Sequence, residues 1–503
     1  MKKILVILSL ISTLSFLPGY ASALSGSDFN PGRIIDDLVF FNKNSMTVSQ
    51  IQDFLNSKVP TCDTNHAGFT GGTGTIYSSP FICLKDFYEN PDATYTVNFT
   101  YKNTSGVDTA GSRTYYENNS YRYTSLTPVY TNGNYTQGYS LKGTMTNVAG
   151  VKPAGSISAA QIIYNAAQTY NINPQVLLVT LQKEQGLITD TWPASWQYQA
   201  AMGYGCPDTA PCSAGYAGFS KQVFSAAYQF RRYTDSPDSY NFKGGTTRYV
   251  QYNPTASCGG TNVAIINQAT ANLYNYTPYQ PNAAALANMS DSSAGGSASC
   301  GAYGNRNFFW YFNRWFGSTT RILIMEPSYG IYLVENGTKR GFTNEEIFYS
   351  YGYRYADVIQ ISKSEIENIP SGPNVPYNVN YRNGRLIKST SSSSVYLVYN
   401  GVKYGFPNEE TFFSHGFNWK DLNIVSDTEI NQIPMGNPIQ YNVNYRNGRL
   451  IRAKGTTGVY LIQEGLKRGF PDESTFIKYG AKWSDVVIVT ASEIGYIPEG
   501  LSL

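Results

Sequence analysis

The hydrophobic positions between Ser156 and Thr319 recur with a helical period, which predicts a compact, mostly helical domain over residues 151–319. One segment of this domain, residues 174–185, is apolar almost all the way round and is therefore expected to lie inside it. Asn173 can cap the first free amides, Pro174 fits the first helical position, and Gly186 suits the left-handed residue that ends a helix. The pattern predicts a buried helix with defined ends.

Residues 24–150 follow a different pattern. Thr47 and Gln50 have the spacing of a capping box, which predicts a short helix at this point. From Asp92 to Gly150, Tyr, Thr and Val alternate with Asn and Gly, as is typical of hairpins or of a long ordered insertion. We therefore expect an α+β region before the helical domain and assign it no function.

The C-terminal residues 320–503 form a tandem repeat with a period of 64 residues. Related hairpin sequences begin at Ile331, Val395 and Val459, each followed by a short helix and an extended segment, and the last unit is partial. Aromatic residues recur in register, and we interpret their recurrence as core packing: Phe342, Phe406 and Phe470, and Tyr355, Trp419 and Trp483. Titratable pairs do not recur convincingly, so we predict three α+β units that serve attachment or spacing.

The N-terminus resembles an export signal. Residues 1–23 combine two lysines, an apolar run and an Ala-Ser-Ala cleavage site, which predicts a secretory signal peptide. No later apolar run is long enough to cross a bilayer, so we expect no membrane span in the mature chain and a secreted, cell-surface location.

Six cysteines agree with an oxidising compartment. Sequential pairing is favoured, although six cysteines permit other connectivities. The expected bridges are Cys62–Cys83, Cys206–Cys212 and Cys258–Cys300.

Composition excludes several classes of function. The net charge is only +3 and charged residues are 14% of the chain, which does not fit a nucleic-acid-binding protein. The two histidines, His66 and His415, lie far apart in sequence, and we expect neither a metal site nor a cofactor. The 43 tyrosines suit a polar, uncharged surface on which sugar rings can stack.

Glu184 is the single carboxylate of the buried helix. Leu177, Leu181 and Glu184 follow i, i+4, i+7 spacing, so the carboxylate shares a stripe with two buried leucines. Desolvation and the nearby helix C-terminus are both expected to raise its pKa. Lys183 would oppose that shift, but adjacent helix positions are expected to point apart. A protonated carboxyl of this kind can donate to a leaving glycosidic oxygen. The alternative is that Glu184 is solvated at the helix end.

The helical domain resembles the lysozyme-like superfamily, and within it the lytic transglycosylases. The resemblance rests on these pieces: Asn173-Pro174, Leu177-Leu178, Glu184, the loop from Ala201 to Gly205, and the turn from Leu273 to Tyr276. Segments 29–90 and 156–318 also resemble a group of secreted bacterial proteins of poorly defined function, some labelled haemagglutinins. The family usually has Ser after the catalytic Glu, where this chain has Gln185, and the Gly-Leu-Met-Gln of its loop is replaced by residues 202–205.

The resemblance implies that Glu184 is the acid/base that cleaves the bond between N-acetylmuramic acid and N-acetylglucosamine in peptidoglycan. It also implies a set of substrate-binding residues: Gln185, Met202, Tyr204, Tyr274 and Tyr276. In the transglycosylase route the sugar's own hydroxyl attacks, and no second carboxylate is needed. If water attacks instead, a partner carboxylate is expected, and Asp190 and Asp208 are the nearest in sequence.

The leading hypothesis is a secreted glycosidase or lytic transglycosylase that acts on peptidoglycan or another cell-surface glycan. A glycan-binding adhesin without catalysis is a second hypothesis, based on Gln185 and the tyrosine-rich surface. A third is a structural cell-surface protein in which the repeats bind the envelope or one another.

Overall fold

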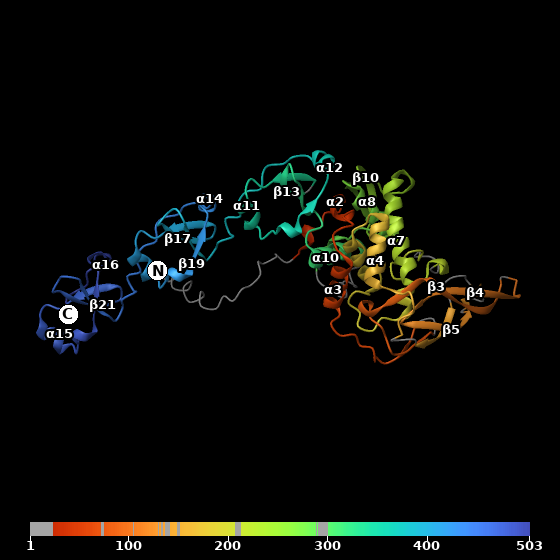
Figure 1. The fold of residues 1–503 in the computed structure, drawn as a ribbon, viewed down its shortest axis with the longest axis horizontal. Coiled ribbons are helices and arrows are strands. Elements are labelled where there is room, and N and C mark those ends of the chain that lie inside the picture. The colour runs from red at the N-terminus through yellow and green to blue at the C-terminus, as the bar shows by residue number, and fades with distance from the viewer. Residues whose placement is uncertain are drawn as a thin grey trace. The chain divides into compact units, whose positions relative to one another are not determined.

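The computed structural model describes residues 24–71, 75–103, 105–128, 130–131, 134–135, 141–147, 151–206, 213–287, 289, 300–335 and 337–503. The predicted signal peptide, residues 1–23, lies outside the described residues. The chain divides into two compact units (Figure 1). The first contains the described residues up to Ile322 with Glu335 and Gly337, and the second contains Leu323–Val334 and Thr338–Leu503. This boundary lies close to the one predicted at 319/320.

The first part of unit 1 mixes short helices with antiparallel strands. Its helices are α2 (Asp37–Phe40) and α3 (Val48–Lys58). Its strands are β1 (Phe69–Thr70), β2 (Ile76–Tyr77), β3 (Tyr88–Lys102), β4 (Asp108–Asn118), β5 (Tyr121–Pro128), β6 (Tyr130–Thr131), β7 (Asn134–Tyr135), β8 (Leu141–Asn147) and β9 (Ile157–Ser158). The predicted capping box of α3 is present, since Thr47 accepts from the Gln50 amide and Gln50 accepts from the Thr47 amide. The long hairpin of β3 and β4 confirms the predicted hairpins.

The second part of unit 1 is mostly helical, as the apolar period predicts. Its helices are α4 (Ala159–Tyr170), α5 (Pro174–Gln185), α6 (Ser195–Gln199), α7 (Phe219–Asp235), α8 (Gln268–Tyr276), α9 (Ala283–Leu286) and α10 (Gly304–Phe316). One antiparallel hairpin, β10 (Thr246–Gln251) with β11 (Gly260–Ile265), interrupts them. Among the described residues, no helix is long and apolar enough to cross a membrane.

A single hydrophobic core joins the two parts of unit 1. Phe40 packs edge-on against Phe230 with ring centroids 5.3 Å apart, and Phe87 stacks on Tyr198 at 4.2 Å. Both pairs connect the N-terminal region to the helices of residues 159–312 within one buried cluster. Aromatic residues from before and after residue 150 therefore fill the same interior.

Unit 2 contains three small sheets built on one plan, each with two short helices. The strands of the first sheet are β12 (Arg321–Glu326), β13 (Gly330–Glu335), β14 (Thr338–Gly341) and β15 (Ile359–Gln360). Those of the second are β16 (Leu386–Ser389), β17 (Val395–Tyr399), β18 (Val402–Gly405) and β19 (Leu422–Val425), and those of the third are β20 (Leu450–Ala453), β21 (Val459–Gln463), β22 (Leu466–Gly469) and β23 (Val486–Val489). The helices are α11 (Glu345–Ser350), α12 (Lys363–Glu367), α13 (Glu409–Ser414), α14 (Asp427–Gln432), α15 (Glu473–Lys478) and α16 (Ala491–Tyr496).

The sheet plan follows from the repeated sequence. In each sheet the first strand pairs in parallel with the last, which lies at one edge beyond the hairpin. The turn of the second hairpin has positive φ at Asn400 and Gly401, and that of the third has it at Glu464 and Gly465. Asn and Gly tolerate this backbone region best, so the predicted tight turns are confirmed here. The whole chain is thus a mixed α+β protein with several compact parts.

Two of the three predicted disulfides lie within the described residues. Cys62 is bonded to Cys83, and Cys258 to Cys300. Cys206 is also disulfide-bonded, and its predicted partner Cys212 lies outside the described residues. Disulfides persist in oxidising compartments, so the folded chain belongs outside the cytoplasm.

Candidate active site around Glu184

Helix α5 brings Glu184 from the core to the surface. The Asn173 side chain accepts a hydrogen bond of 2.7 Å from the Gln175 amide, Pro174 starts the helix, and Gly186 ends it with φ of 70°. Residues 176–181 are buried, whereas the Glu184 side chain in the last turn is 25% exposed. The helix ends are confirmed, and the carboxylate lies at the border between interior and solvent rather than in a fully dry position.

Lys183 pairs with Glu184, contrary to the sequence expectation. The Lys183 Nζ lies 2.8 Å from Glu184 Oε1, and its side chain is only 5% exposed. The ammonium also donates to Thr277 Oγ1 at 2.7 Å and lies 5.3 Å from the centre of the Tyr276 ring. The prediction that these neighbours point apart is wrong because the long lysine side chain bends toward Thr277 and Tyr276 and reaches the carboxylate on the way. A buried positive charge therefore accompanies Glu184.

The loop after α6 approaches the other carboxylate oxygen. Gly203 has φ of +67°, and a Cβ at this position would lie 2.8 Å from Glu184 Oε2. A side chain here would displace the carboxylate and would also strain the backbone. The loop that the sequence matched to the transglycosylases thus borders Glu184.

Gln222 on α7 holds this loop in place. Its Oε1 accepts from the Met202 amide at 3.1 Å and the Tyr204 amide at 3.0 Å. Its Nε2 donates to the carbonyls of Tyr204 at 2.9 Å and Tyr216 at 2.8 Å. The side chain is fully buried, so all four hydrogen bonds form away from water. The sequence analysis did not predict Gln222 as a site residue. Its position between Phe219 and Ala226, on the apolar stripe of α7, could have indicated a buried polar side chain with a structural role.

Tyr276 closes the site from α8. Its hydroxyl donates to the Met202 carbonyl at 2.6 Å, and its ring packs 4.7 Å from Phe230. Burial, and after it the charge of Glu184, raises the pKa of Tyr276 well above its usual value. The hydroxyl therefore stays neutral and acts as a donor, which fixes the loop beside the carboxylate. Tyr276, predicted as a substrate-binding residue, thus lies beside Glu184 and the Met202 backbone, and its contact with substrate stays a prediction.

Tyr204 lies at the outer side of the same loop. Its ring meets Tyr216 edge-on at 4.8 Å, and burial raises the pKa of its hydroxyl. Tyr216 and Tyr228 nearby on the chain are exposed tyrosines of this unit. Aromatic rings and neutral hydroxyls of this kind suit contact with sugars.

Two other predicted residues have structural roles. Tyr274 is fully buried and donates to the Pro31 carbonyl at 3.0 Å, so its prediction as a substrate contact is wrong: it fills the core beside Phe242. The Met202 side chain is also fully buried, and only its backbone takes part in the loop contacts.

The residues after α5 are tied together by Gln197. Its Nε2 donates to the Gln185 carbonyl at 2.9 Å and to Asp190 Oδ2 at 2.8 Å. The other Asp190 oxygen accepts from the Trp192 amide at 2.9 Å. Asp190, predicted as a possible second carboxylate, thus has both oxygens engaged in holding a turn. Asp208, the other candidate, lies outside the described residues.

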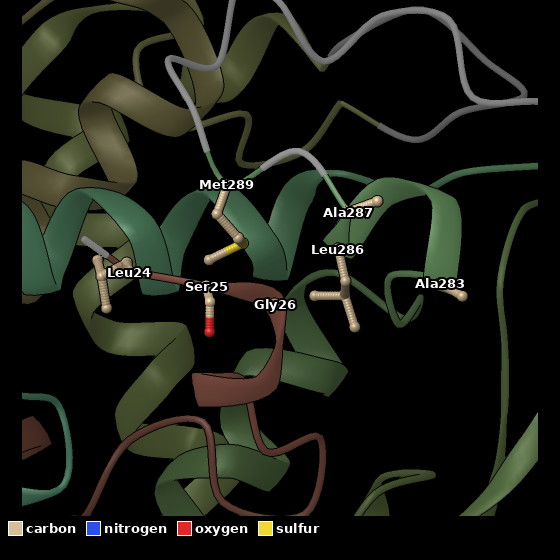
Figure 2. A pocket seen from close by; sticks show the side chains of 7 residues that line it. All are labelled: Leu24, Ser25, Gly26, Ala283, Leu286, Ala287 and Met289. Atoms are coloured by element: carbon tan, nitrogen blue, oxygen red, sulfur yellow. The ribbon is translucent and has the colours of Figure 1, made fainter. Parts of the chain in front are cut away.

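A cavity of about 630 Å³ lies elsewhere in unit 1 (Figure 2). Its lining is almost entirely apolar: Leu24, Ser25, Gly26, Ala283, Leu286, Ala287 and Met289. It contains no titratable side chain and none of the residues around Glu184, so it contributes nothing to acid–base chemistry.

The family comparison matches the middle of the chain. The sequence model described as LasA, N-terminal domain, matches residues 112–325. The match runs from within β4 to within β12 and contains α5, the loop at Gly203 and α8. It covers less than half of the chain, so it records the similarity of this segment to that domain.

Two solved structures show a distant likeness. They are the periplasmic assembly of the ESX-5 inner membrane complex and an intact ESX-5 inner membrane complex, and each aligns with 36% of this chain at 10% identity and a TM-score of 0.11. The chain covers 66% and 57% of those chains, respectively. A TM-score of this size supports no argument about fold or function. No curated protein matches this sequence.

Proposed function

We propose that this protein is a secreted glycosidase or lytic transglycosylase that cleaves the glycan strand of peptidoglycan, with Glu184 as general acid and base. The observation that carries the proposal is the carboxylate at the end of a buried helix, bordered by Lys183, Gly203 and Tyr276. A single partly exposed carboxylate on a rigid support suits proton transfer to a bound sugar.

In the proposed reaction the Glu184 carboxyl first donates its proton to the glycosidic oxygen, and the bond from that oxygen to the sugar's anomeric carbon breaks. The resulting carboxylate then takes the proton from the same sugar's 6-hydroxyl as its oxygen bonds to the anomeric carbon. One bond breaks, one forms, and Glu184 recovers its proton. Lys183 at 2.8 Å stabilises the carboxylate that exists between the two transfers.

This route needs no second carboxylate. Asp190, the candidate second carboxylate among the described residues, accepts from Gln197 and from the Trp192 amide and so holds the turn after α5. The product would carry an anhydro ring rather than a new reducing end.

The test is release of soluble fragments from purified peptidoglycan. Glu184→Gln should reduce release by roughly 100-fold or more while the protein stays folded. Asp235→Asn is the matched control, since this carboxylate also lies in unit 1 and pairs with a basic side chain, Arg231, but is exposed. Equal release by Glu184→Gln and the unaltered protein would exclude Glu184 from the reaction.

A second candidate function is glycan binding without catalysis. The ion pair with Lys183 favours it, because a carboxylate already neutralised by an ammonium can be a purely structural group. In that case the protein sediments with peptidoglycan but releases no product detectable by mass spectrometry.

A further inference from the structure

The repeats of unit 2 carry exposed aromatic rings at one equivalent position. Tyr355, Trp419 and Trp483 follow each other at the 64-residue period and are 48%, 44% and 50% exposed. The interpretation of all recurring aromatics as core packing is therefore wrong for this set. Phe342, Phe406 and Phe470, the other recurring set, are half-buried and pack on Phe348, Phe412 and Phe476.

Each exposed ring is held by a buried phenylalanine beneath it. Trp419 stacks on Phe412 with centroids 4.3 Å apart and an interplanar angle of 9°. Trp483 lies 4.6 Å from Phe476 at 30°, and Tyr355 lies 5.3 Å from Phe348 at 39°. The phenylalanines are at most 2% exposed, so each forms a fixed base for the outer ring. A ring fixed in this way loses little conformational entropy when a ligand covers it.

A carboxylate lies at the edge of the outer rings. The Tyr355 hydroxyl donates to Glu345 Oε1 at 2.9 Å, and the Trp483 Nε1 donates to Glu473 Oε1 at 3.3 Å. Glu409 occupies the equivalent position in the second repeat. An aromatic face with a hydrogen-bond acceptor at its rim matches a pyranose ring, whose C–H face can stack while its equatorial hydroxyls donate outward.

We propose that Tyr355, Trp419 and Trp483 are three equivalent stacking sites for the sugar rings of an uncharged polysaccharide. The carboxylates of Glu345 and Glu473 at the rims of Tyr355 and Trp483 oppose polyanionic chains and accept from neutral hydroxyls. Three sites of the same kind on one chain suit a polymer, since binding at one site raises the effective concentration of sugar rings at the next. This binding is independent of the chemistry proposed for Glu184.

The test uses the full mature protein and insoluble chitin, a neutral β-linked polymer of N-acetylglucosamine, in a sedimentation assay. Replacing all three rings by alanine, as Tyr355→Ala, Trp419→Ala and Trp483→Ala, should weaken binding by roughly 100-fold. The matched control is Tyr399→Ala with Ile424→Ala and Ile488→Ala, because these side chains are similarly exposed and lie in the second and third repeats. The control should bind as the unaltered protein does.

Further variants keep the test decisive. Trp419→Tyr with Trp483→Tyr should retain binding, because Tyr355 shows that the first repeat already uses tyrosine here. Each single alanine variant leaves two sites intact and should weaken binding several-fold, which covers the case in which the triple variant does not fold. Glu184→Gln should sediment like the unaltered protein, so loss of catalysis and loss of binding are separable. Unchanged sedimentation of the folded alanine variants, or stronger binding to polygalacturonate than to chitin, would overturn the proposal.

Discussion

At the scale of single residues, the surroundings of Glu184 depend on contacts that no local pattern contains. The helix ends around it follow from Asn173, Pro174 and Gly186, and all three act as the sequence predicts. The ion pair with Lys183 depends on Thr277, which lies 94 positions later in the chain. Spacing rules describe where a helix position points, but a lysine with four methylene groups can bend back to a partner supplied by another helix.

Gly203 offers the most specific test at this scale. Gly203→Ala should place its Cβ against Glu184 Oε2 and should strongly reduce fragment release from peptidoglycan. Gly205→Ala is the matched control, since Gly205 also has positive φ, of +70°, but its Cβ would meet Tyr216 instead. Both variants should lose about 1 kcal/mol of unfolding free energy from backbone strain. Equal activity of the two variants would contradict the placement of this loop beside the carboxylate.

Gln222 gives a second test. Gln222→Leu removes four hydrogen bonds from the loop and leaves buried backbone groups unpaired, so the free energy of unfolding should fall by about 2 kcal/mol or more. Gln229→Leu, on the same helix but half-buried, should cost less than about 1 kcal/mol. Chemical denaturation measures both. Similar losses for the two variants would show that Gln222 does not hold the loop.

At the scale of elements, the sequence predicts helix caps correctly but does not reveal the buried ion pairs. The caps at Thr47 and Asn173 are present as the sequence predicts. The repeats nevertheless contain recurring titratable pairs: Arg382 bonds to Glu429, and Arg446 bonds to Glu493 in the same register. The prediction that titratable pairs do not recur is therefore wrong. The Arg and Glu of each pair lie 47 positions apart in sequence and meet only when the repeat folds, so local spacing does not reveal them. The identical YNVNYRNGRLI segments at Tyr377 and Tyr441 were the available signal.

The first repeat lacks this arginine and provides an internal control. Glu365 is the equivalent of Glu429, but it is exposed and forms a capping box with Ser362. Glu429→Gln leaves the mostly buried Arg382 without its carboxylate and should cost about 2 kcal/mol of unfolding free energy. Glu365→Gln should cost less than about 0.5 kcal/mol, because Gln can keep the capping box. Hydrogen exchange of the second repeat should report the same difference, and equal costs would argue against a stabilising role of the pair.

At the scale of the whole molecule, the sequence predicts the class of each segment but not which segments share a core. The change from hairpins to helices near residue 150 is real, yet Phe40 and Phe87 from before it pack on α7 and α6. Glu89 adds a polar link, since its Oε2 accepts from the Ser220 amide at the start of α7 at 2.7 Å. Long-range packing of this kind leaves no periodic trace in either segment, and the shared core therefore could not be predicted.

Glu89 makes the stability of the packing between the two parts of unit 1 depend on pH. The side chain is almost fully buried, and desolvation raises its pKa above the usual 4.5. The folded state then holds a proton that the unfolded state has released, so this contribution to stability is complete below about pH 4.5 and is lost as pH rises through the raised pKa. Glutamine does not titrate, so the Glu89→Gln variant does not lose this contribution as pH rises. The stability of Glu89→Gln relative to the unaltered protein should thus increase with pH above 4.5, by at most about 1.4 kcal/mol per pH unit. Parallel profiles of unfolding free energy against pH would contradict this.

The central claim, that Glu184 cleaves a glycan strand, is tested most directly by the mass spectrum of products released from purified peptidoglycan by the full mature protein. The account predicts disaccharide fragments that carry an anhydro ring with the unaltered protein and none above background with Glu184→Gln. The same fragments from both proteins, or no fragments from either, would contradict it.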